Sequence, residues 1–401
     1  MTVGTRPDGS QRPALVDRRL ATVIGIAVVT LPVLVLPELE GRLVTRVVAF
    51  AVILAGLNLL TGFGGQLTLG HGAAVGLGAV TTAVLVTNYQ IHQLLALPIA
   101  AGVGLVGGLV MGLPALRIRG MYLALVTMTM AVAFPLAVKR YGWLTGGSNG
   151  KRIVPELTGP GWPVIGDDHV WVHLIVVAIA FPVLIAVANL VDSRPGRALR
   201  AVAANPTSAT STGVDGRAVT LQLFALASAV GAIGGSLLAF ETPFVSADTY
   251  SVFLSFQLYA AVVVGGLAHR HGHWAGAVLF VAAPWVIEEL GFVVEDTLVF
   301  GAVLLAVTFL LPGGVMSGMD HIVERFRTAP SSGDPGGRPA ARPSVTRIVV
   351  DREGNVHEVA ADHPRGAIAP PSVPGGWRTE PAENGEREHR DPFPPRVPPG
   401  W

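Results

Sequence analysis

The sequence predicts an all-α polytopic membrane protein with about ten transmembrane helices and a largely disordered C-terminal tail. Of its 401 residues, 51% are hydrophobic and only 14% are charged, whereas a soluble protein carries about 25% charged residues. No Lys, Arg, Asp or Glu lies between Arg46 and Arg117, and a gap of that length holds roughly three membrane spans. The segment after position 319 holds fourteen of the 30 prolines.

The composition also excludes several functions. A net charge of +1 gives no electrostatic case for a nucleic-acid partner. The chain has no cysteine, which excludes disulfides, cysteine-based zinc sites and thiol catalysis. Its only lysines, Lys139 and Lys151, do not lie in a phosphate-binding G-x-x-x-x-G-K-[ST] loop. Without a nucleophile elbow, paired catalytic carboxylates or an H-E-x-x-H motif, we expect no catalytic residue, metal site or cofactor.

Along the chain, residues 1–19 are polar and form a short N-terminal segment. The apolar run 20–37 is longer than the core of a signal peptide, and no small-residue cleavage site follows it, so we expect a retained helix. The transmembrane domain spans residues 20–319. Its uncharged runs predict ten spans: 20–37, 43–61, 67–87, 94–115, 121–138, 170–191, 219–240, 252–268, 274–291 and 297–312.

The basic residues of short loops predict the orientation in a cell membrane. Both termini, the Arg117 turn, loop 192–218 and the Arg270 turn are expected in the cytoplasm. The acidic loops face outward. Loop 139–169 is basic, but this arrangement places it outside, because longer loops constrain topology less.

The tail, residues 320–401, is rich in proline and in charges of both signs, a composition that cannot bury enough apolar surface to fold. Within it, "VTRIVVDREGNVHEV" (345–359) has two β-prone runs around Glu353-Gly354-Asn355. This pattern fits a small hairpin. Because a lone hairpin is marginally stable in water, a flexible tail is the alternative.

The stretch "NLLTGFGGQLTLGHG" (58–72) places glycines and polar residues inside an apolar region. Glycines interrupt helices, and a broken helix is tolerated at membrane depth only where protein or a water-filled cavity covers its backbone. The stretch therefore predicts a short or broken helix near 62–72 that lines or shapes a pathway. For His71 itself, hydrogen bonding to a neighbouring carbonyl within tight packing is the alternative. The candidate residues are Asn58, Gly62, Gly64, Gly65, Gln66, Thr68 and His71.

Three further segments carry candidate residues. In loop 192–218, Pro195 opens one helix, Asn205-Pro206 breaks it and opens a second, and Gly213 ends the second. A helix pair of this kind suits docking into another subunit, and a solvated linker is the alternative. The outer "LTGGSNG" (144–150) is either an ordinary turn or a gate or docking contact. In "AHRHGHW" (268–274), we interpret the three histidines as a cationic turn rather than a metal site.

Five motifs, in this order, resemble the permease subunits of ABC importers for branched-chain amino acids, of the LivM type. They are "GLNLLTGFGGQLTLGHGA", "LRIRGMYLALVTMTMA", "LTGGSNG", "RPGRALRAVAANPTSATSTGVD" and "VVVGGLAHRHG", and the resemblance covers about residues 45–312.

The resemblance implies that two related permeases form the path, that two cytoplasmic ATPases drive it, and that an extracytoplasmic binding protein delivers the amino acid. It implies that segment 193–216 is the ATPase-coupling loop, with the residues Gly196, Arg197, Arg200, Asn205, Pro206 and Gly213. In the outer loop it points to Thr145, Gly146, Gly147 and Ser148.

This chain departs from the family pattern in two places. It has Ala203-Ala204-Asn205 where Arg-Glu-Asn is common, and it has Gly72 and Val75 where Ala and Phe are common. Permeases for urea and short amides share these motifs and are an alternative. A secondary transporter that needs no ATPase and a membrane scaffold are further alternatives.

Overall fold

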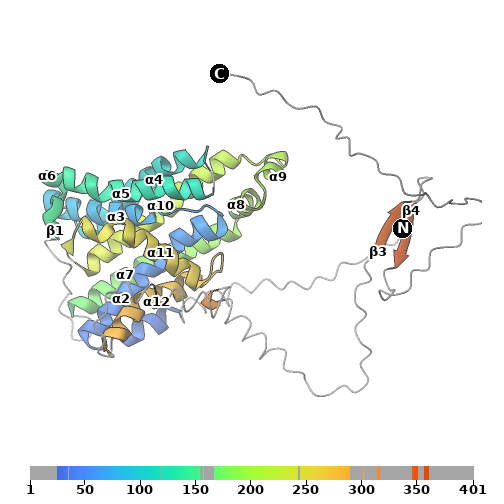
Figure 1. Cartoon of the computed structure of the whole chain (residues 1–401). Helices are drawn as coiled ribbons and strands as arrows, with labels where there is room; N and C mark the ends of the chain where they lie inside the picture. The colour runs from blue at the N-terminus through green and yellow to red at the C-terminus, as the bar shows by residue number, and fades with distance from the viewer. Residues whose placement is uncertain are drawn as a thin grey trace, which may run out of the picture. The chain divides into compact units, whose positions relative to one another are not determined.

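The computed structural model describes residues 25–34, 36–118, 120–153, 157, 167–242, 244–289, 301, 314–316, 346–350 and 356–360. The chain divides into two compact units, residues 1–329 and residues 330–401. The described part of the first unit is a bundle of helices, drawn in Figure 1 with the labels used below.

Within the described residues, six helices are long and apolar enough to cross a membrane, and they correspond to the second to seventh predicted spans. Their bounds are as follows: α2 (Glu38–Asn58) continued by the π-helix η1 (Leu59–Phe63), α3 (His71–Tyr89), α4 (Gln93–Ala115), α5 (Met121–Arg140), α7 (Asp168–Asp192) and α10 (Gly216–Glu241).

Two shorter apolar helices, α11 (Val252–Gly265) and α12 (Gly272–Glu289), correspond to the eighth and ninth predicted spans. Residues 25–33 are helical within the first predicted span. Residues 20–24 and 35 of that span, and almost all of the tenth span, lie outside the described residues.

Short elements connect these helices. They are α6 (Gly142–Thr145), the 3₁₀ turn η2 (Gly147–Asn149), β1 (Lys151–Arg152), α8 (Arg194–Ala204), α9 (Pro206–Ser211), β2 (Phe244–Val245) and the 3₁₀ turn η3 (Asp248–Tyr250). Strands β1 and β2 pair antiparallel, with Lys151 opposite Val245 and Arg152 opposite Phe244.

In the second unit, β3 (Thr346–Val350) pairs antiparallel with β4 (Val356–Ala360). Thr346 lies opposite Ala360 and Val350 lies opposite Val356. The predicted hairpin is therefore present. The prediction of disorder for the rest of the tail falls on residues outside those described.

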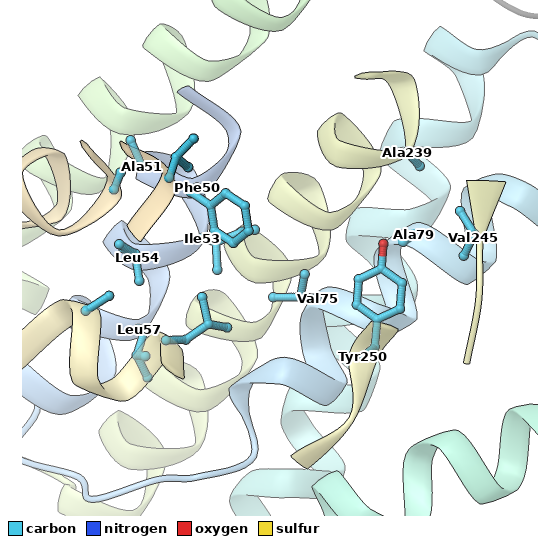
Figure 2. Close-up of a cluster of buried hydrophobic side chains, with 14 of the residues drawn as sticks. Phe50, Ala51, Ile53, Leu54, Leu57, Val75, Ala79, Ala239, Val245 and Tyr250 are labelled. Atoms are coloured by element: carbon cyan, nitrogen blue, oxygen red, sulfur yellow. The ribbon is translucent and has the colours of Figure 1, made fainter. Parts of the chain in front are cut away.

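The core of the first unit is a cluster of buried side chains that joins α2, α3, α10, α11 and α12. Figure 2 shows Phe50 and Ile53 of α2 beside Val75 of α3, with Tyr250 approaching Ala79. Lipid tails are as apolar as these side chains, so the helices associate through close packing and internal hydrogen bonds. The shape of the contact surfaces therefore decides which helices meet.

Helix α10 lies against α2, α3 and α4 at positions where one of the two helices carries glycine. A Cβ added at Gly78 would overlap the backbone carbonyl of Ala232, and a Cβ at Gly235 would overlap that of Val75. At the same level, the Thr82 hydroxyl donates to Ser236 Oγ (2.9 Å), which donates to Ala232 O (3.0 Å). Glycines thus bring the backbones together, and a buried hydroxyl pair joins them.

The predicted loops group at two ends of the bundle. Arg270 forms an ion pair with Asp192 (3.0 Å), so the Arg270 turn and loop 192–218 share one end, called the α8–α9 end. Lys139 forms an ion pair with Asp248 (2.6 Å), and β1 pairs with β2. The basic loop 139–169 therefore begins at the same end as the acidic loop after α10, called the β1–β2 end.

Most helix boundaries differ from the prediction by a few residues, and three of the larger differences are as follows. Helix α2 begins at Glu38 rather than 43, because Glu38 pairs with Arg42 one turn later. Helix α3 begins at His71 rather than 67, because the helix break extends further than expected. Helix α11 ends at Gly265 rather than 268, because Gly266 has φ 114°.

Two glycines of α4 test the packing of α10. A Cβ at Gly104 would overlap Ala232 Cβ and lie 2.9 Å from Ser228 O, whereas a Cβ at Gly102 would have no neighbour within 4 Å. We expect Gly104→Ala to destabilise the fold by about 1–3 kcal/mol, the usual cost of overpacking. Gly102→Ala should be neutral or stabilising by up to about 1 kcal/mol, because alanine favours helix. Thermal unfolding of the detergent-solubilised protein measures both, and equal effects would contradict the packing described.

Candidate functional site

The predicted helix break is present between α2 and α3. The last turn of α2 widens into η1, residues 64–70 leave the helical path, and α3 starts at His71. Gly64 N–H donates to Leu59 O (3.0 Å) and Gln66 N–H to Leu60 O (3.1 Å), so the chain turns without losing these backbone bonds. Gly65 has φ 62°, a left-handed conformation that strains other residues.

Asn58 connects the break to the turn between α11 and α12 by two side-chain hydrogen bonds. Its side chain is 2% exposed. The amide oxygen accepts the Ala268 N–H (3.0 Å), and the amide nitrogen donates to His269 O (3.1 Å). Gly62 makes room for this contact, because a Cβ there would overlap both Asn58 Oδ1 and Ala268 N.

Gly64 and Gly65 face different helices. A Cβ at Gly64 would overlap Leu223 of α10. A Cβ at Gly65 would lie 3.4 Å from Ala203 Cβ of α8, which is ordinary contact distance. The break therefore touches the helix pair of loop 192–218 directly.

The remaining polar groups of the break bond to local or neighbouring backbone. Gln66 is half-buried, and its amide donates to Gly64 O (3.3 Å). Thr68 is buried and its hydroxyl accepts from Gly70 N–H (3.3 Å). Thr127 of α5 accepts the Leu69 N–H (3.0 Å). Sequence reasoning missed Thr127, since nothing in the pattern of α5 marks its hydroxyl as a partner for a distant loop.

His71 is 2% exposed, and its Nε2 donates to Ile53 O of α2 (3.2 Å). Across from it lies Gly231 of α10, where a Cβ would come within 2.9 Å of the imidazole ring. The ring thus fills a space between three helices. Of the two interpretations, this geometry favours the packing histidine with a carbonyl partner.

The two helices of loop 192–218 have side-chain caps at their starts. Ser193 caps α8 by accepting the Gly196 N–H (3.4 Å), and Asn205 caps α9 by accepting from Thr207 (3.0 Å) and Ser208 (3.1 Å). After α9, Gly213 has φ 83° and Val214 N–H bonds back to Ala209 O (3.1 Å). Each helix therefore begins and ends where the Pro, Asn and Gly signals predict.

The two faces of the pair have different surroundings. Leu199, Val202 and Ala209 are buried against the bundle. A Cβ at Gly196 would overlap Val191 O, so α8 lies in backbone contact with the end of α7. Most of the rest of the pair is exposed. This exposed face carries the arginines Arg194, Arg197 and Arg200, together with small, amide-bearing and hydroxyl-bearing residues: Ala201, Ala204, Asn205, Thr207, Ser208, Thr210, Ser211 and Thr212.

Asn58 and Arg200 are brought together at a cavity of about 160 Å³ between α2, α7, α8 and the turn before α12. Arg200 donates to Val191 O (2.9 Å) and Arg197 to Asp192 O (3.3 Å). Asp192 and Arg270 also line this cavity. The Asp192–Arg270 ion pair was not predicted from the sequence. The opposite charges of the two residues, and their predicted location on the same side of the membrane, were a usable signal.

The "LTGGSNG" segment (144–150) folds into the end of α6 and the 3₁₀ turn η2. Thr145 Oγ1 donates to Val138 O (2.7 Å), and Gly146 and Gly147 have φ 86° and 62°. Lys151 closes the segment by donating to Leu144 O (2.7 Å) and to the Asn88 side chain. Partial burial lowers the pKa of Lys151. Ser148 is exposed at the tip.

The structure shows the surroundings of two residues that depart from the family pattern, Gly72 and Ala203. Gly72 N–H donates to Ser255 Oγ (3.0 Å), and a Cβ at Gly72 would lie 2.5 Å from that oxygen, so alanine would displace α11. Ala203 is exposed at the end of α8, with Gly65 beside it.

Comparison with known proteins gives one family and several relatives. Residues 41–310 match the family described as the permease component of the branched-chain amino acid transport system. The chain is 26% identical to the high-affinity branched-chain amino acid permease protein LivM of Escherichia coli over 293 residues, which is 68% of each chain. The LivM of Salmonella typhimurium gives the same values. A probable LivM of Methanocaldococcus jannaschii is 26% identical over 237 residues, 56% of this chain and 68% of that relative. No solved structure matches significantly.

Two amides of the break differ in their expected contribution to stability. Asn58→Ala should cost about 1–3 kcal/mol, since it removes two part-buried hydrogen bonds at about 0.5–1.5 kcal/mol each. Gln66→Ala should cost under about 1 kcal/mol, because its one bond is long and half-exposed. Thermal unfolding in detergent compares the two variants. A tolerated Asn58→Ala would show that the bonds to Ala268 and His269 are unimportant.

Proposed function

Because the chain belongs to the family of permease components of branched-chain amino acid transport systems, we propose that it is the membrane subunit of an ABC importer for branched-chain amino acids. In this role it forms the translocation path together with a second related permease. Two separate cytoplasmic ATPase subunits drive the cycle, and an extracytoplasmic binding protein delivers the amino acid.

One observation carries the proposal: the α8–α9 pair is fixed to the bundle on one face and exposed on the other. Leu199 and Val202 anchor the pair, and Gly196 brings α8 against α7. A solvated linker would need neither the caps nor the buried face. Since the sequence has no phosphate-binding loop, an ATP-driven cycle needs a partner ATPase, and the exposed face of α8–α9 is a surface on which that partner can dock.

The helix break has a supporting role in this proposal. Its glycines and polar groups let a non-helical segment lie inside the membrane, where unsatisfied backbone groups are costly. Because the described polar side chains bond to backbone, we assign residues 58–71 to shaping the path rather than to contacting the substrate.

The β1–β2 end is the outer face in the proposed orientation, and the α8–α9 end is cytoplasmic. The exposed Ser148 lies beside the paired strands β1 and β2, and Lys151 bonds to the segment that carries it. We assign this surface to contact with the binding protein. The subunit then lies in the cell membrane with both termini in the cytoplasm.

Reconstitution tests the proposal. The purified chain alone should hydrolyse no ATP. Combined with its partner permease, ATPases and binding protein in proteoliposomes, it should take up leucine, isoleucine or valine only when ATP is supplied on the ATPase side.

Three other results would each contradict a different part of the proposal. ATP hydrolysis by this chain alone would exclude the subunit role. Uptake that continues without the ATPases would favour a secondary transporter. Uptake of urea or short amides in place of branched-chain amino acids would keep the importer and change its substrate.

A further inference from the structure

The turn between α11 and α12, residues 266–271, touches two parts of the molecule that are distant in sequence. We call it the hairpin turn. On one side it bonds to Asn58, at the end of α2. On the other side its Arg270 pairs with Asp192, the last residue of α7. It therefore stands between the helix break and the start of α8.

The hairpin turn is rigidly built. Gly266 has φ 114°, and Ala268 has φ 57°, a conformation that residues other than glycine seldom adopt. A Cβ at Gly265 would overlap Gly272 O, and one at Gly276 would overlap Ala261 O, so the two helices meet backbone to backbone. Helices packed this closely move as one body, because their contact surface leaves no room for sliding.

The link to Asn58 is part-buried and uses both ends of the amide. It holds two peptide groups of the hairpin turn, through Ala268 N–H and His269 O, and Gly62 leaves the space that this requires. A displacement of the hairpin turn must therefore displace the end of α2 and the π-helical start of the break.

The link to α8 includes the Arg270–Asp192 ion pair. Asp192 is followed directly by Ser193, the cap of α8, and Arg197 of α8 bonds to Asp192 O (3.3 Å). The Asp192 and Arg270 side chains are 40% and 46% exposed. A pair this exposed contributes little to folding stability, so its effect on function can be separated from its effect on the fold.

The space between these elements is not filled by packing. Asn58, Asp192, Arg200 and Arg270 surround the cavity of about 160 Å³. At this cavity the hairpin turn, the end of α2 and the start of α8 are joined by the polar links at its edge, beside the direct contact of Gly65 with Ala203.

We propose that Asn58, Asp192 and Arg270 are positioning residues that transmit motion of the α8–α9 loop through the hairpin turn to the helix break. The inference rests on the proposed function, in which a partner ATPase moves that loop. These residues contact neither ATP nor substrate; they fix the distance between the loop and the break.

A charge exchange in the complete reconstituted complex tests the link. Four forms are compared: the wild type, Asp192→Arg, Arg270→Asp, and the double exchange. The measured quantities are branched-chain amino acid uptake, ATP hydrolysis and assembly. We expect each single variant to assemble and to take up about fivefold less amino acid per ATP, the lower end of typical coupling between sites. The double exchange should recover most of the loss.

Glu38→Arg is the control, because it reverses a comparably exposed ion pair at the other end of the bundle, and it should keep wild-type uptake per ATP. Single variants that also keep the wild-type ratio would overturn the inference, as would a double exchange that recovers nothing. Failure of the proposed function has a different signature, since the wild-type complex itself would then show no ATP-driven uptake.

Discussion

The close approach of α10 to α2, α3 and α4 is the constraint on which the rest of the bundle depends. In a membrane, apolar side chains gain little free energy when they exchange lipid contacts for protein contacts. Helices therefore associate where their backbones can approach closely. Gly78, Gly104 and Gly235 provide that approach, and the Thr82–Ser236 bond fixes its level. Because α2 and α3 both pack against α10, their positions are fixed by that helix. The segment that connects them therefore need not be helical.

That freedom explains how the helix break persists. Its backbone groups are satisfied by nearby carbonyls and by Thr127, and Ser255 takes the Gly72 N–H. The break is therefore an ordered, hydrogen-bonded connection that lies against the α8–α9 loop and the hairpin turn. A permease driven by a separate ATPase needs such a place, where a displacement at the membrane surface reaches an irregular segment inside.

Local patterns predicted much of this arrangement. Uncharged runs gave the second to seventh spans, and Pro195, Asn205-Pro206 and Gly213 gave α8 and α9 within a residue or two. What the sequence could not predict are contacts between distant segments. The sequence predicted that Asn58 faces a pathway, but its side-chain amide instead bonds to a turn more than 200 residues away in the sequence. Neither this bond nor the Asp192–Arg270 pair has a local signature, because each depends on how closely the glycines let the helices meet.

The central claim is that the α8–α9 loop and the helix break move as one unit during transport. A single disulfide tests it directly, since the chain has no cysteine of its own. A Cβ at Gly65 lies 3.4 Å from Ala203 Cβ, near the separation found in disulfides. In the complex carrying Gly65→Cys and Ala203→Cys, ATP-driven uptake should be the same whether the bond is oxidised or reduced. Uptake that stops on oxidation and returns on reduction would show that the loop and the break separate in each cycle, which would contradict the account.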